Sequence, residues 1–318
     1  MATEGDSKDP NWERSVLERL AYSAIKEQRR ARRWGIFFKL LTFAYLTFLL
    51  LAVSDWKPEG DLATGGHTAL IDVAGVIDSD GTVNADNITN SLQQAFKDEN
   101  TKGVILRVNS PGGSPVQSGI IYDEIRRQRS LHPDIKIYAV VEDLCASGGY
   151  YIASATDEIY VDKASIVGSI GVIMDQFGFT GAIEKLGVER RVLTSGENKA
   201  FLDPFSPLRP EHAAHAKQML GEIHQQFIDV VKKGRGNRLK DSPELFSGLF
   251  WTGAKSIELG LADHFGNVES VARDVIKAEQ IVDYTQKENL AERFAKRFGA
   301  TMADALAGIY SKQSISLR

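Results

Sequence analysis

The sequence of 318 residues predicts an α/β fold with a parallel, layered sheet. Two apolar runs typical of buried strands, residues 103–108 and 135–141, each end in a glycine-containing turn that a helical segment follows. Repeated strand–turn–helix units favour a parallel sheet whose strand ends converge on one edge. A third observation, the apolar stretch over residues 34–54, predicts one N-terminal transmembrane helix before that domain.

Each further element follows from its own pattern. The core is predicted to begin with a strand over residues 68–73, which is rich in apolar residues. Apolar residues at helical spacing predict helices over residues 86–98, 116–131, 150–154, 211–232 and 290–309. The last of these lies beyond the predicted core, so we expect it to pack on the domain or on a neighbouring subunit.

Charge and hydropathy divide the chain into successive segments. The prediction is a charged tail over 1–33, an anchor over 34–54, a tether over 55–66, a folded domain over 67–285 and an amphipathic extension over 286–318.

The anchor prediction rests on residues 36–53, which are apolar except for Lys39 and two threonines. Basic residues precede this stretch and mostly acidic residues follow it, an asymmetry that places the N-terminus in the cytoplasm and the large domain outside. A cleaved signal peptide is the alternative, because residues 52–54 are small. Residues 1–33 are longer than the usual polar start of a signal peptide, which favours an uncleaved anchor.

Composition excludes several function classes. The net charge of −4 gives no support for nucleic-acid binding, which needs a basic patch. Cys145 is the only cysteine, so the chain has no internal disulfide, and we expect its thiol to be a small buried group. No cluster of cysteine and histidine indicates a metal, and no motif predicts a cofactor.

Ser147 lies in the run Cys-Ala-Ser-Gly-Gly directly after the second predicted strand. A serine there sits at a helix N-terminus, where free N–H groups and the helix dipole favour negative charge. Gly148 removes a side chain that would keep a substrate carbonyl away. This setting suits a nucleophile, but it equally suits a serine that only caps the helix.

The first glycine turn, residues 109–114, has the sequence Asn-Ser-Pro-Gly-Gly-Ser. Backbone N–H groups of Gly112 or Gly113, together with that of Gly148, are candidates for an oxyanion hole. An ordinary turn and a phosphate cradle are the alternatives. The phosphate interpretation lacks both the lysine of a P-loop and the third glycine of a dinucleotide motif.

Residues 69–272 resemble the signal peptide peptidase A family of membrane-anchored serine proteases, in its short single-repeat form. The matching segments, in the family's order, are residues 109–114, 145–153, 167–172, 195–207 and 250–263. The resemblance implies a Clp protease/crotonase-like fold and a catalytic Ser/Lys dyad. It also implies that residues 67–285 are a protease domain on the periplasmic side of the inner membrane, which degrades remnant signal peptides and similar apolar peptides.

A serine nucleophile needs a base. By the resemblance this base is Lys199, although on sequence alone a loop lysine is usually just exposed. Asn198 departs from the family pattern, which has an aromatic or charged residue there. His212 and His215 share a helix face and remain an alternative base, or else a solvated surface. None of the 6 histidines lies between Ser147 and His212.

Lysine serves as a base only when it is neutral, so its pKa must fall well below about 10.4, and apolar surroundings lower it. Phe201, Leu202 and Phe205 are expected to help build such surroundings. Ser169 matches a family serine that would hold the ammonium nitrogen in place. The alternative for Ser169 is an ordinary turn serine between two glycines.

The chain has one repeat, whereas the resemblance implies that tandem-repeat relatives carry the serine and the lysine in different repeats. We therefore expect a homo-oligomer, a closed ring, in which Lys199 of one subunit reaches Ser147 of the next.

The rival functions are a crotonase-type acyl-CoA enzyme, a catalytically silent membrane scaffold and a related membrane protease with a regulatory target.

Overall fold

The computed structural model describes residues 12–53 and 65–286, and the chain divides into two compact units, 1–62 and 63–318. In the first unit, one continuous helix, α1 (Trp12–Val53), covers the second part of the predicted charged tail and most of the predicted anchor. Among the described residues, no helix combines the length and the apolar character needed to cross a membrane. Residues 49–54 of the predicted anchor lie outside those whose side chains are described, and the anchor stays a prediction.

In the second unit, the described strands form one mixed sheet with the order β6-β5-β3-β2-β1-β8. The strand β4 pairs with the first half of β3 and also with β7. Only β5 and β6 are antiparallel. The strands are β1 (His67–Ala74), β2 (Thr101–Ser110), β3 (Lys136–Ala146), β4 (Glu158–Val161), β5 (Ile166–Gly168), β6 (Phe250–Thr252), β7 (His264–Phe265) and β8 (Ile281–Asp283).

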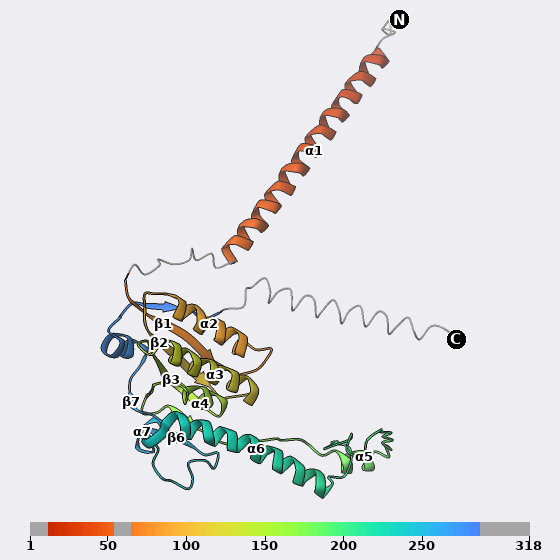
Figure 1. Ribbon diagram of the computed structural model, residues 1–318. Helices are drawn as coiled ribbons and strands as arrows, with labels where there is room; N and C mark the ends of the chain where they lie inside the picture. The colour runs from red at the N-terminus through yellow and green to blue at the C-terminus, as the bar shows by residue number, and fades with distance from the viewer. Residues whose placement is uncertain (1–11, 54–64, 287–318) are drawn as a thin grey trace, which may run out of the picture. The chain divides into compact units, whose positions relative to one another are not determined.

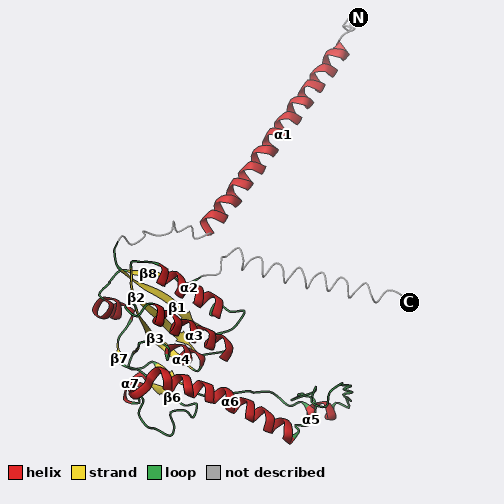
Figure 2. Cartoon of the chain, viewed as in Figure 1, coloured by secondary structure: helices red, strands yellow, loops and turns green. Residues whose placement is uncertain are grey.

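Helices cover both faces of this sheet (Figures 1 and 2). On one face lie α2 (Ala85–Lys97), α3 (Pro115–Leu131) and α4 (Gly148–Ala153), packed on the buried residues of β1, β2 and β3. On the other lie α8 (Val268–Ser270) and the π-helix η2 (Val271–Ile276). The predicted α/β class is confirmed, and the mixed sheet with its helices fits a Clp/crotonase-like domain.

The predicted strands lie within β1, β2 and β3, and the predicted helices correspond to α2, α3, α4 and α6 (Pro210–Arg235). The predicted helix over 290–309 lies outside the described residues, as does most of the predicted tether. The remaining helices are α5 (Thr180–Lys185), the 3₁₀ turn η1 (Gly236–Arg238) and α7 (Gly253–Glu258).

Residues 171–209, which we call the arm, lie away from the sheet. Figure 1 shows α5, part of the arm, beside the end of α6 that is remote from the sheet. Several large apolar side chains of the arm are exposed, including Ile173 at 85%, Phe177 at 78% and Leu193 at 99%. Such a surface is unusual for a segment that contacts only water.

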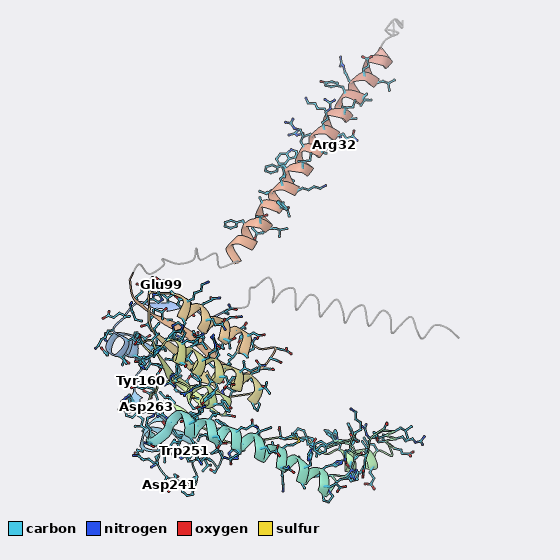
Figure 3. The ribbon with its side chains drawn as sticks, in the orientation of Figure 1. Arg32, Glu99, Tyr160, Asp241, Trp251 and Asp263 are labelled. Atoms are coloured by element: carbon cyan, nitrogen blue, oxygen red, sulfur yellow. The ribbon has the colours of Figure 1, made fainter. Side chains whose placement is uncertain are left out.

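The other end of α6 is fixed to the core by a buried ion pair. Arg235, which is 1% exposed, donates two hydrogen bonds of 2.8 Å to the carboxylate of Asp263. The same carboxylate accepts the N–H of Ile159 in β4. Figure 3 labels Asp263 together with Tyr160 and Trp251 near this end of the helix. Burial alone would raise the pKa of Asp263, but the hydrogen bonds and charge of Arg235 outweigh burial and lower it.

Replacing Asp263 with alanine should destabilise the domain by about 3–5 kcal/mol, because Arg235 would stay buried without its partner. Because the folded-state pKa of Asp263 is lowered, its contribution is complete at neutral pH and is lost as the pH falls below about 3.9. Urea unfolding at pH 7 and pH 3 measures both effects. The control is Lys255→Ala, which breaks the exposed pair with Glu258 and should change stability by less than about 1 kcal/mol. Equal losses in both variants would contradict this role for Asp263.

Candidate active site

Ser147 occupies a strained turn between β3 and α4. Its backbone angles are φ 51° and ψ −121°, in a region that disfavours residues with a side chain. Its N–H donates a hydrogen bond of 2.9 Å to the carbonyl of Gly168. Its side chain makes no capping hydrogen bond, so the alternative of a simple helix cap is wrong. The hydroxyl is therefore available for chemistry.

The two predicted glycine turns meet at Ser147. A Cβ atom on Gly112 would lie 2.7 Å from the Ser147 Cβ and 2.7 Å from the Gly148 nitrogen. A Cβ on Gly113 would overlap the carbonyl of Ile77. Real Cβ atoms do not approach other atoms so closely, so both positions require glycine.

One of the three backbone N–H groups predicted as oxyanion donors is already bonded within the turn. The N–H of Gly112 donates to the Ser110 hydroxyl at 3.1 Å, so Gly112 shapes the turn rather than facing a substrate. Among the described residues, no acceptor is bonded to the N–H of Gly113 or Gly148. The Gly113 nitrogen also lies 3.3 Å from where a Gly148 Cβ would stand. These two N–H groups lie together beside Ser147, the arrangement that stabilises an oxyanion.

A small cavity of about 40 Å³ adjoins Ser147. Tyr151 of α4, Val172 of the arm, and Ile223 and Phe227 of α6 supply much of its apolar lining. A larger cavity, about 820 Å³, is lined by Arg107 and Glu142, but it includes none of the predicted site residues. The smaller cavity is therefore the one relevant to the chemistry of Ser147.

Ser169 lies beside the same turn. It also has a positive φ, 53°, and the neighbouring Gly168 carbonyl is the acceptor for the Ser147 N–H. His224 of α6, which the sequence analysis did not single out, lies with its Nε2 3.1 Å from the Ile170 carbonyl. His224 thus holds the segment that carries Ser169. No sequence motif marks such a contact, because it joins residues 54 positions apart.

Lys199 does not reach Ser147 within the chain. It is exposed on the arm, and its neighbour Asn198 is bonded to His212 in the first turn of α6. Phe227, at the Ser147 cavity, lies further along the same helix. At 1.5 Å per residue, the two contacts on α6 are about 20 Å apart.

Two of the residues expected around Lys199 make their ring contacts with other side chains. Phe201 packs instead against His212 and His215, and Phe205 stacks on Phe179. His215 is exposed, whereas His212 is buried, so the interpretation of both histidines as solvated surface is wrong for His212. Both lie at the arm end of α6, remote from Ser147, which argues against the alternative that either is its base.

Cys145, two residues before Ser147, is not a competing nucleophile. Cys145 is fully buried, as predicted, and burial raises the pKa of its thiol, which keeps the thiol protonated and unreactive. Among the described residues, no group of three or more metal-binding side chains comes together. Within that part of the chain, Ser147 is the group whose geometry suits nucleophilic attack.

The fold and this turn define an α/β protein that presents a serine at a strand–helix turn. The profile of peptidase family S49 matches residues 129–282. A protein named signal peptide peptidase SppA, from Enterococcus faecium, is 31% identical over 246 residues, which cover 73% of this chain and 71% of that protein. A protease of Synechocystis is 33% identical over 207 residues, 65% of this chain and 72% of the relative. The chain belongs to peptidase family S49, the signal peptide peptidase A family.

A third relative differs in name and in coverage. A protein of Brucella abortus named Na⁺/H⁺ antiporter NhaA is 50% identical over 182 residues, 57% of this chain. The match spans 25% of that protein's length, so the matched part of this chain corresponds to about a quarter of that protein.

Because the backbone at Ser147 is strained, we predict that a substitution which relieves the strain raises stability, while loss of the hydroxyl removes activity. Ser147→Gly should stabilise the domain by about 1 kcal/mol, because glycine adopts a positive φ freely, and it should abolish activity. Ser147→Ala should also be inactive but should leave stability within about 0.5 kcal/mol of the native protein, because it keeps the strain. Chemical denaturation of the three proteins measures the difference. A glycine variant no more stable than the alanine variant would show that the turn stores no strain.

Proposed function

We propose that this chain is a membrane-anchored serine endopeptidase in which Ser147 is the nucleophile and Lys199, from a neighbouring subunit, is the base. The observation that carries the proposal is the turn itself. A strained, uncapped serine lies beside two unpaired backbone N–H groups, those of Gly113 and Gly148. Membership of peptidase family S49 supports hydrolysis of peptides as its use.

In this mechanism Lys199 Nζ takes the proton of the Ser147 hydroxyl as Oγ bonds to the peptide carbonyl carbon. The N–H groups of Gly113 and Gly148 donate to the oxygen that becomes negative. The C–N bond then breaks, and Lys199 returns its proton to the leaving amine. Water attacks the acyl-enzyme with Lys199 again as base, which releases the second product and restores Ser147.

A shared site follows from the position of Lys199. A lysine serves as a general base only in surroundings that exclude water, and Lys199 is exposed in its own chain, so a second surface would have to cover it. The arm that carries Lys199 exposes Ile173, Phe177 and Leu193, which a neighbouring copy would bury. We propose a closed homo-oligomer in which each arm delivers Lys199 to the next subunit's Ser147. There Ser169 would accept a hydrogen bond from the ammonium nitrogen.

The proposed substrates are remnant signal peptides and similar apolar peptides. A relative named signal peptide peptidase supports this class. The cavity of about 40 Å³ beside Ser147, with its apolar lining, fits a small side chain before the cleaved bond. An N-terminal anchor would hold the domain on the periplasmic side of the inner membrane, where such peptides remain after secretion. The proposal needs no metal, cofactor or nucleic acid.

Lys199→Ala and Lys199→Arg should each lower kcat for an apolar peptide by at least about 10³-fold, because alanine has no base and guanidinium stays protonated. A fluorogenic peptide assay, with labelling of Ser147 by a fluorophosphonate, measures the loss. Lys233→Ala, a change of another exposed lysine, is the matched control and should keep native activity. Substantial turnover by Lys199→Ala at neutral pH would refute the base, and hydrolysis of acyl-CoA thioesters in place of peptides would favour the crotonase-type function.

A further inference from the structure

His212 contacts the residues on both sides of Lys199. Its Nε2 lies 3.1 Å from the side-chain oxygen of Asn198, and because an amide oxygen only accepts, Nε2 donates this bond. Its ring lies 5.1 Å from the ring of Phe201. One buried side chain, 6% exposed, therefore holds the residue before Lys199 and the second residue after it.

The turn around Lys199 has few other supports. The Lys199 N–H donates to the Gly196 carbonyl at 3.2 Å, and the Phe201 N–H donates to the Asn198 carbonyl at 3.0 Å. Both bonds lie within the loop, so neither fixes the loop to the helix. Of these contacts, only those made by histidines tie the loop to α6, and His212 makes the hydrogen bond.

His215 provides a natural comparison. It lies one turn further along α6, and its ring also contacts Phe201, at 5.6 Å and nearly edge-on. It is exposed, and it has no hydrogen bond to Asn198. The two histidines thus share the aromatic contact and differ in the bond to Asn198.

We propose that His212 is a positioning residue for the base: it orients the loop of Lys199 through Asn198 and Phe201, so that Nζ meets the neighbouring subunit's Ser147 in the reactive geometry. This inference rests on the proposed function of Lys199. An error of about 1 Å in the placement of a catalytic group costs up to about 100-fold in rate. Asn198 is also where the sequence departs from the family pattern, so the bond is a feature of this chain.

The test separates the effect of the hydrogen bond between His212 and Asn198 from that of the ring contact between His212 and Phe201. His212→Phe keeps a ring against Phe201 and removes the donor, whereas His212→Gln restores an N–H donor. We expect His212→Phe to lower kcat by about 10- to 100-fold with KM within about twofold, and His212→Gln to recover most of the loss. Asn198→Ala should reproduce the loss, and the double variant should be no worse than either single one, because both remove the same bond. His215→Phe is the control and should keep native kcat.

Three outcomes would overturn the inference: native kcat in His212→Phe, no recovery in His212→Gln, or additive losses in the double variant. Oligomeric mass and melting temperature, measured for every variant, show whether a loss comes from misfolding; if His212→Phe misfolds, Asn198→Ala supplies the same test. The activity of Lys199→Ala distinguishes failure of the proposed base from failure of the positioning role of His212 alone. If this variant is active, the proposed base fails and His212 with it, whereas an inactive Lys199→Ala beside an active His212→Phe removes only the positioning role.

Discussion

The buried ion pair between Arg235 and Asp263 is the constraint on which the arrangement of the site depends. It fixes one end of α6 to the sheet, and the helix then extends for 26 residues, about 39 Å, without a break. Ile223, midway along the helix, and Phe227, closer to the fixed end, help to form the cavity at Ser147. The opposite end carries the loop of Lys199. A helix anchored in this way keeps the two residues of the proposed dyad apart within one chain, and for this reason we propose that a second subunit completes the site.

The serine side of the site is complete without that second subunit. Ser147 is held in an unfavourable backbone conformation by the helix that follows it and by the bond from its N–H to Gly168. Gly112 and Gly113 let the neighbouring turn approach Ser147 and Gly148 closely. In this half Gly148 is buried and Ser147 is half-buried, whereas Lys199 is exposed. The proposed oligomer joins a preorganised half-site to a base that assembly alone would desolvate.

The sequence predicted the parts of this account that depend on local patterns. Apolar runs located β1 to β3, and paired glycines located both turns, because these signals need only neighbouring residues. The resemblance to the signal peptide peptidase A family led to the prediction that Lys199 is the base and that two subunits share each site. Features that depend on packing were not predictable, including the bond from Gly112 to Ser110, the burial of His212 and the bond of His224 to Ile170. Each depends on how α6 and the turns pack, and no periodicity records that packing.

The central claim, that the dyad forms between subunits, is tested most directly by mixing two inactive proteins. Ser147→Ala and Lys199→Ala are dissociated, combined and allowed to reassemble, and mass spectrometry confirms mixed oligomers. The account predicts that peptidase activity returns in part, because some interfaces then pair an intact Ser147 with an intact Lys199. Mixed oligomers without any activity, beside native protein that recovers after the same treatment, would place both residues in one subunit and contradict the account.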